Sequence, residues 1–288
     1  MKVTDLDSAP HLKMLIYGDS GSGKTTFLGS AMLCEETFPL LVLNASGQPI
    51  SLRYLEQRPL VLEIETIKDF NAVYTWLLNG QTMGHLQKLD RELYDVVDVY
   101  LKSVDAKRFN SIAIDSITQV QRIAMEQITM TPDGKGHVAG HTLPENPGDI
   151  PAATQIQHWG RTLALMTNFA DKYFKLDMYV FMTALCRRDD VPSMGYTLFC
   201  PFLWGQSNLE IPSHAEIVGR LMNTGTISMK EQRDVTSAAS SAGQDVPFNI
   251  MYLRGGRDFI AKWQGIQNAP AMIANPTVEK FIRKYNAS

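Results

Sequence analysis

The sequence predicts an α/β fold with a mostly parallel central sheet and helices on both of its faces. Strand-like apolar runs alternate with segments long enough for helices. A glycine-rich motif also stands between the first apolar run and the segment that follows it, in a strand, turn and helix context. Because 288 residues with 44% apolar content can bury a large core, we expect one domain over residues 1–288, with its core at 12–265.

Each element follows from its own stretch of sequence. The strand-like runs are 14–17, 40–43, 60–64, 112–114 and 178–182. Apolar residues return every three or four positions in 69–78, 91–101, 117–128 and 159–174, which predicts helices there. Toward the C-terminus, the apolar FNIMYL at 248–253 and the following GGRDFIAKW predict a hairpin at the sheet edge. Two stretches without a period, 129–151 and 234–247, are expected to be mobile loops, and a short tail ends the chain.

The stretch GDSGSGKT at 18–25 fits the phosphate-binding pattern G-x-x-x-x-G-K-[ST]. Its glycines permit backbone conformations in which successive N–H groups surround a phosphate chain. Lys24 is expected to reach the β- and γ-phosphates of ATP, and the Thr25 hydroxyl is expected to bind Mg²⁺. The positions predicted to contact the nucleotide are Gly18, Asp19, Ser20, Gly21, Ser22, Gly23, Lys24, Thr25 and Thr26.

A partner carboxylate for this loop stands in FNSIAIDS at 109–116, where an apolar strand ends in Asp115. Magnesium keeps several waters and takes few direct protein ligands, so Asp115 would hold the ion through its water shell. Asp115 or Ser116 could also cap the helix that follows, and both roles can hold together. The predicted metal ligands are therefore Thr25 and Asp115.

Composition argues against several other classes of protein. The formal charge of −3 provides no global basic field, so any nucleic-acid contact would have to come from a local patch, and the charge neither proves nor excludes DNA. The three cysteines lack C-x-x-C spacing, which argues against a disulfide framework or a zinc knuckle. His137 and His141 lie in a glycine- and proline-rich stretch, which predicts a loop rather than a metal site. A polar N-terminus, and no run near the roughly 18 apolar residues of a membrane span, predict a cytoplasmic protein without a membrane partner.

Three motifs carry a family resemblance: GDSGSGKT, IAIDSITQV at 112–120 and LDMYVFMTAL at 176–185. Together they resemble the RecA-like P-loop ATPases of bacteriophages, and more narrowly the compact ones linked to single-strand annealing and recombination. That group also shares the Trp159-Gly160 pair and the Ala-Lys of FIAKW. The resemblance implies a homo-oligomeric ATPase acting in DNA recombination, annealing or replication in an infected host cell, with single-stranded DNA as a partner.

The resemblance also implies roles for two further residues. Thr183 matches the polar sensor that lies near the γ-phosphate, and Lys262 matches a cation placed across a subunit boundary onto the neighbour's γ-phosphate. With these two, the predicted catalytic set is Lys24, Asp115, Thr183 and Lys262.

The chain departs from the family where water is activated. Ser46 stands where RecA-like hydrolases carry a glutamate, and Leu185 stands where the family often has histidine. A serine hydroxyl is a poor general base at neutral pH. We therefore expect slow or conditional hydrolysis, with any base recruited from Glu63, Glu65 or a neighbouring subunit.

Two alternatives follow from the same residues. In the first, the chain is a structural or regulatory subunit that binds a nucleotide without useful hydrolysis. In the second, it is a small-molecule P-loop kinase in which Arg187 and Arg188 clamp the transferred phosphate. These arginines, followed by Asp189 and Asp190, are also compatible with a solvated charged hairpin.

Overall fold

The structure, a computed structural model, describes residues 11–47, 49–130, 156–191, 196–226, 248–264 and 269–286. Its strands are β1 (Lys13–Gly18), β2 (Leu40–Asn44), β3 (Leu60–Glu63), β4 (Ser111–Asp115), β5 (Tyr179–Val191), β6 (Tyr196–Pro201), β7 (Ile217–Asn223), β8 (Asn249–Tyr252), β9 (Lys262–Trp263) and β10 (Met272–Ala274). Its α-helices are α1 (Lys24–Gly29), α2 (Ile67–Leu78), α3 (Met83–Leu89), α4 (Arg91–Ser103), α5 (Ile117–Met130), α6 (Ile156–Phe174), α7 (Ser207–His214) and α9 (Val278–Asn286). Short 3₁₀ turns are η1 (Ser30–Leu33), η2 (Ile50–Tyr54) and η4 (Thr224–Thr226).

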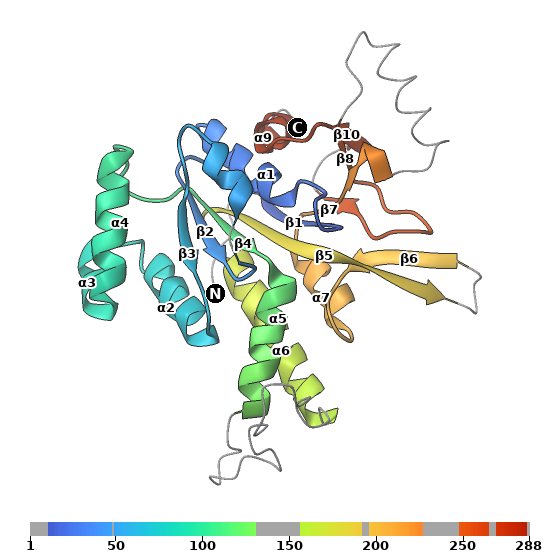
Figure 1. Cartoon of the computed structure of the whole chain (residues 1–288), viewed down its shortest axis with the longest axis horizontal. Helices are drawn as coiled ribbons and strands as arrows, with labels where there is room; N and C mark the ends of the chain where they lie inside the picture. Colours follow the sequence, from blue (N-terminus) through green and yellow to red (C-terminus); the bar gives the residue numbers. More distant parts are fainter. Residues whose placement is uncertain are drawn as a thin grey trace, which may run out of the picture.

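The strands form one 10-stranded sheet in the order β10-β8-β7-β1-β5-β4-β2-β3, with β6 paired to β5 and β9 paired to β7 (Figure 1). All pairs from β7 across to β3 are parallel, whereas β8, β9, β10 and β6 pair antiparallel to their neighbours. This arrangement confirms the predicted α/β fold with a mostly parallel central sheet. β1 lies between β7 and β5, and the loop that follows it opens at the edge where the parallel strands have their carboxyl ends.

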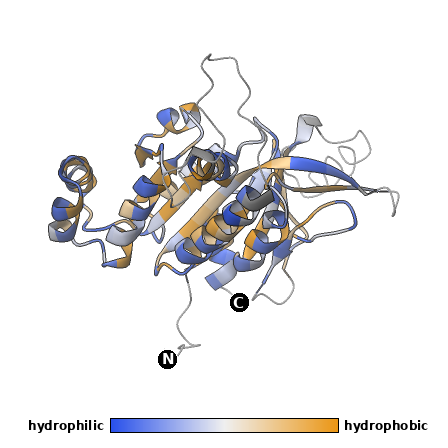
Figure 2. Cartoon of the chain, turned by 90° about the horizontal axis from the view of Figure 1, so that it is seen from below, coloured by the Kyte–Doolittle hydropathy of each residue, from blue (hydrophilic) through white to orange (hydrophobic). Residues whose placement is uncertain are grey.

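The hydrophobic core occupies both faces of the sheet. In β1, Leu15 and Tyr17 pack toward α2, α5, α6 and α7, while Met14 and Ile16 pack toward α1 and α9. All six β1 residues are buried, as expected for a parallel strand covered by helices on both sides. The two layers of helices are visible in Figure 1, and in Figure 2 the hydrophobic colour follows the central strands while the helices carry both colours.

Local signals explain where several helices begin. Thr66 and Asp69 form a capping box at the start of α2, in which each side chain accepts a hydrogen bond from the other residue's backbone N–H. The Asp90 carboxylate accepts from Leu93 N at 3.0 Å and caps α4.

Two elements differ from the sequence-based expectation. The fifth strand extends beyond residue 182 to Val191, because its charged second half leaves the core and pairs with β6. We call the paired residues 186–191 and 196–201 the arm, which projects from the sheet in Figure 1. At the C-terminal edge, β8 pairs with β10. The segment GGRDFIAKW does not return against β8 but pairs with β7 through its last two residues, which form β9.

Several expected features lie outside the described residues. These are the predicted loops at 131–151 and 234–247, including His137 and His141, whereas residues 129 and 130 end α5. Among the helices that the structure describes, none is long and apolar enough to cross a membrane.

Candidate nucleotide-binding site

Close backbone contacts explain the glycines of the loop between β1 and α1. A Cβ on Gly18 would lie 2.2 Å from the carbonyl oxygen of Leu221 in β7, so no side chain fits there without moving that strand. Gly23 precedes α1 with a φ of 91°, in the left-handed region that favours glycine. Ser22 N donates to Asp19 O at 3.2 Å and closes the loop between them.

Lys24 lies over this loop with its ammonium among backbone oxygens. Its Nζ donates to Gly18 O at 2.8 Å and to Asp19 O at 2.7 Å. Burial lowers the pKa of Lys24, and the nearby carboxylates of Asp115 and Asp19 partly oppose that change. The chain thus directs a positive group to the same loop whose backbone would surround phosphates.

Asp115, at the end of β4, accepts hydrogen bonds from side chains of two neighbouring elements. Its Oδ2 accepts from the Thr25 hydroxyl at 2.8 Å and its Oδ1 accepts from the Thr183 hydroxyl at 2.5 Å. Both carboxylate oxygens therefore face threonine hydroxyls of α1 and β5 rather than the start of α5. Asp115 and Thr183 are buried, so these charge-assisted hydrogen bonds are little weakened by water.

The oxygens of Thr25 and Asp115 fit a hard divalent cation. Magnesium prefers hydroxyl, carboxylate and water oxygens over nitrogen or sulfur. Because the Thr25 hydroxyl and one Asp115 oxygen are already 2.8 Å apart, a single ion and its water shell can engage both. The donor chemistry of this pair is therefore compatible with Mg²⁺.

A cavity of about 460 Å³ opens beside Lys24 and Thr25 and extends to the end of β2 and the first turn of α5. Ser46 lines it, and its hydroxyl donates to the Ser116 hydroxyl at 3.1 Å. Leu185 also lines it. Of the described residues that form the cavity wall, Asp115 alone carries a carboxylate.

The glutamates considered as substitute bases lie elsewhere. Glu63 and Glu65 are exposed and do not line this cavity. Glu63 ends β3, the strand at the far edge of the sheet beyond β2. Glu63 pairs with Asn44, which does line the cavity, but β2 separates β3 from the strand that carries Asp115.

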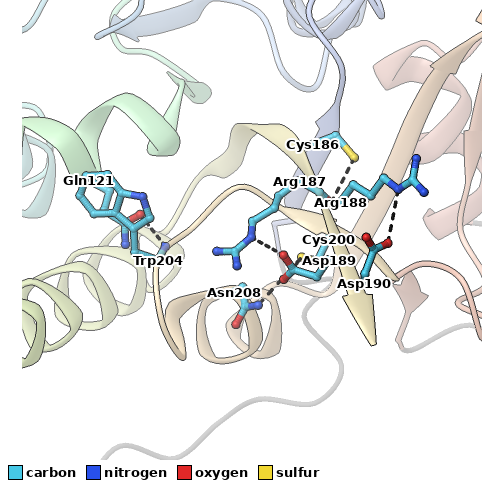
Figure 3. A network of polar contacts seen from close by, with 9 residues as sticks. All are labelled: Gln121, Cys186, Arg187, Arg188, Asp189, Asp190, Cys200, Trp204 and Asn208. Atoms are coloured by element: carbon cyan, nitrogen blue, oxygen red, sulfur yellow. Dashed lines mark hydrogen bonds and ion pairs between the residues drawn. The ribbon is translucent and has the colours of Figure 1, made fainter. Parts of the chain in front are cut away.

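The arginines of the arm are engaged with their own neighbours. Arg187 forms an ion pair with Asp189, and Arg188 Nε lies 3.6 Å from an Asp190 oxygen (Figure 3). The four residues follow one another in β5, so each pair occupies one face of the strand. Neither arginine lines the cavity, and their charges are balanced within the arm.

The structure places Lys262 far from the other predicted catalytic residues. Lys262 pairs with Val218 near the beginning of β7, whereas the phosphate-binding loop contacts β7 at Leu221. Its Nζ donates to Ser213 O at 3.0 Å. The fold therefore brings Lys24, Asp115 and Thr183 together and leaves Lys262 apart.

Two residues of α5 that sequence reasoning missed, Thr118 and Gln119, complete the cavity wall. Ser116, directly before the helix, lines it as well. The Thr118 hydroxyl accepts from Leu185 N at 3.0 Å and so fixes the first helical turn to β5. Their position directly after Asp115 was the available signal, because the first turn after such a strand must lie beside the loop.

The residue before the loop connects it to the arm. The Tyr17 hydroxyl lies 2.6 Å from Ile260 O and 3.1 Å from the carbonyl oxygen of Phe199, an arm residue opposite Arg188. Burial raises the pKa of Tyr17 well above its ordinary range, so the hydroxyl keeps its proton for these contacts. Phe199 N in turn donates to Asp258 O at 2.7 Å.

Comparison with known proteins identifies a family that this chain matches. A protein-family profile described as an AAA domain matches residues 11–262. The crystal structure of the RadB recombinase aligns with 15% identity and a TM-score of 0.35, over 75% of this chain and 76% of that chain. The monomer form of the pCW3 conjugation coupling protein TcpA with ATPgS aligns with 14% identity and a TM-score of 0.37, over 90% of this chain and 62% of that chain. The search of curated proteins found no match.

Proposed function

The chain belongs to the AAA-domain family, and from this premise we propose that it binds ATP with Mg²⁺ in the cavity beside Lys24. One observation carries the proposal: the Thr25 and Thr183 hydroxyls meet on Asp115, next to the loop that holds Lys24. In this assignment the backbone of residues 18–26 surrounds the phosphates and Lys24 neutralises the β- and γ-phosphates. Thr25 and Asp115 hold the ion, which supplies positive charge at the phosphate oxygens when bound.

Hydrolysis is proposed to be slow or conditional. Attack on the γ-phosphate needs a water molecule held in line with the bond that breaks. Ser46 and Leu185 supply neither a strong base nor a charge at the cavity wall. The described cavity wall therefore lacks a general base, and any such base would be brought by a neighbouring subunit.

We further propose a role in bacteriophage DNA recombination, annealing or replication, in the cytoplasm of the infected host. The support is the resemblance of the three sequence motifs and the Ala-Lys pair described above. In a homo-oligomer, Lys262 of one copy would face the γ-phosphate of the next, and its distance from its own loop is compatible with that arrangement. Single-stranded DNA is the proposed partner.

A second candidate function is a structural or regulatory subunit in which bound ATP stabilises an assembly without turnover. The observation that favours it is the cavity wall, where Asp115 is the one carboxylate among the described lining residues. Nothing comparable favours the kinase alternative, because Arg187 and Arg188 are paired with aspartates of the arm.

The test measures ATP binding and ATP turnover on the same samples, with and without single-stranded DNA. Lys24→Ala removes the loop cation and should abolish most affinity for the γ-phosphate. Lys262→Ala should leave binding intact and reduce turnover if the lysine acts across a subunit boundary. Turnover that requires Lys24 and rises with DNA supports the DNA-linked ATPase, and binding without turnover supports the structural subunit. Unchanged ATP binding in Lys24→Ala would refute the proposed site.

A further inference from the structure

We propose that the side-chain amide of Gln119 positions the water that attacks the γ-phosphate of bound ATP. The inference rests on the proposed nucleotide site and identifies how that site could work without the missing glutamate. It assigns a residue that neither the loop motif nor the position of Ser46 indicates.

The first step of the argument concerns the other polar groups of the cavity wall. Asp115 has both carboxylate oxygens engaged by threonine hydroxyls. Ser46 and Ser116 are hydrogen-bonded to each other at 3.1 Å. Leu185 contributes an apolar surface. Asn44, the other amide of the described wall, donates to Gly47 O and accepts from Ser46 N at 3.3 Å, so both ends of that amide are engaged.

The Gln119 amide is less fully engaged than these groups. It is half-buried and lines the same cavity as Lys24. Its Oε1 accepts from Arg122 Nη1 at 3.5 Å, a length at which a hydrogen bond is weak. Within the part of the chain that the structure describes, its amide nitrogen has no recorded hydrogen-bond partner. One amide can both accept from a water molecule and donate to a phosphate oxygen.

The backbone beneath Gln119 is fixed on two sides, which a positioning group requires. Gln119 N donates to Ser116 O at 3.0 Å. The neighbouring Thr118 hydroxyl accepts from Leu185 N at 3.0 Å and ties the same turn to β5. The residue that carries the amide is thus held against both β4, through Ser116, and β5.

The chemistry follows from what an amide can and cannot do. Gln119 Oε1 accepts a hydrogen bond from the water, which turns the oxygen lone pair toward the γ-phosphorus. A bond forms between the water oxygen and phosphorus as the bond from phosphorus to the β–γ bridging oxygen breaks, and ADP leaves with that electron pair. Because the amide is not a base, the water proton passes to a γ-phosphate oxygen, and the products are ADP and inorganic phosphate.

The experiment compares Gln119→Ala and Gln119→Glu with Gln127→Ala, a matched glutamine substitution on the same helix whose side chain accepts from Ile67 N at 3.4 Å. ATP affinity, kcat and the pH dependence of kcat are measured for each purified protein. Gln119→Ala should lose about 100-fold in kcat, the scale of a misplaced reactant, with a much smaller change in ATP affinity. Gln127→Ala should behave as wild type.

Gln119→Glu distinguishes a role at the reacting water from a structural one. A carboxylate there can act as a base, so kcat should recover relative to Gln119→Ala. The pH profile of kcat should also gain a new acid limb, because kcat falls as the carboxylate is protonated. Wild-type kcat in Gln119→Ala, or no new acid limb in Gln119→Glu, would overturn the inference and leave the nucleotide site intact. ATP binding without any wild-type turnover overturns it equally, whereas loss of ATP binding in the wild type would remove the proposed function itself.

Discussion

Replacing Thr183 with valine removes one hydroxyl from the buried carboxylate of Asp115 and keeps almost the same side-chain shape. The lost contact is the 2.5 Å hydrogen bond to Oδ1, and both residues are buried. A hydrogen bond to a charged group contributes about 1.5–3 kcal/mol to stability. Because valine fills the same space, this contact should dominate the change. A cost near 2 kcal/mol corresponds to roughly a 30-fold shift in the unfolding equilibrium.

The assay is denaturant unfolding of the protein without nucleotide, followed by circular dichroism. Thr197→Val is the matched control, because Thr197 makes the same kind of bond to Asp190 at 2.8 Å on the exposed arm. Water can replace that exposed contact, so its loss should change the free energy of unfolding by less than about 0.5 kcal/mol. If Thr183→Val is as stable as wild type, the reasoning that the hydroxyl stabilises an ionised Asp115 is wrong.

Three further outcomes are expected. Gly18→Ala should weaken ATP binding at least tenfold, because its Cβ would lie 2.2 Å from Leu221 O, whereas Gly84→Ala, with open space around its Cβ, should bind ATP normally; equal affinities in a titration would contradict this. Ser46→Glu should raise ATP turnover, since it places a carboxylate in the cavity wall, and an unchanged rate would show that the site lacks more than a base. Burial lowers the pKa of Lys13 to about 8, so the unfolded chain binds more protons between that value and about 10.4, and stability should rise there by up to about 1.4 kcal/mol per pH unit. Lys13→Met should remove this rise, and parallel unfolding curves for the two proteins over that pH range would count against it.

Local sequence predicted the centre of the fold and half of the candidate site. The glycine pattern of residues 18–25 reflects a chain path that other residues cannot follow, as the contact between Gly18 and Leu221 illustrates. The apolar run that ends in Asp115 likewise predicts that this residue lies where a strand ends, at the edge of the sheet. Both signals are short-range, so they can be recognised in the sequence without any knowledge of tertiary contacts.

Long-range contacts were not visible in the same way. The contact between Thr183 and Asp115 spans 68 positions, and no periodic pattern encodes it. The charged half of β5 belonged to no apolar run, because apolar patterning reports burial, but its pairing with β6 fits the charged hairpin that was one of the two interpretations of these residues. Gln119 was missed because a single polar residue on an amphipathic helix looks the same whether it faces solvent or a cavity.

Tyr17 connects the arm to the phosphate-binding loop. Its hydroxyl is bonded to the carbonyl oxygens of Phe199 in the arm and of Ile260 outside it, and Tyr17 directly precedes Gly18 in β1. A shift of β1 at Tyr17 would therefore be transmitted to the arm through the contact with Phe199, one residue from the loop that the nucleotide would occupy.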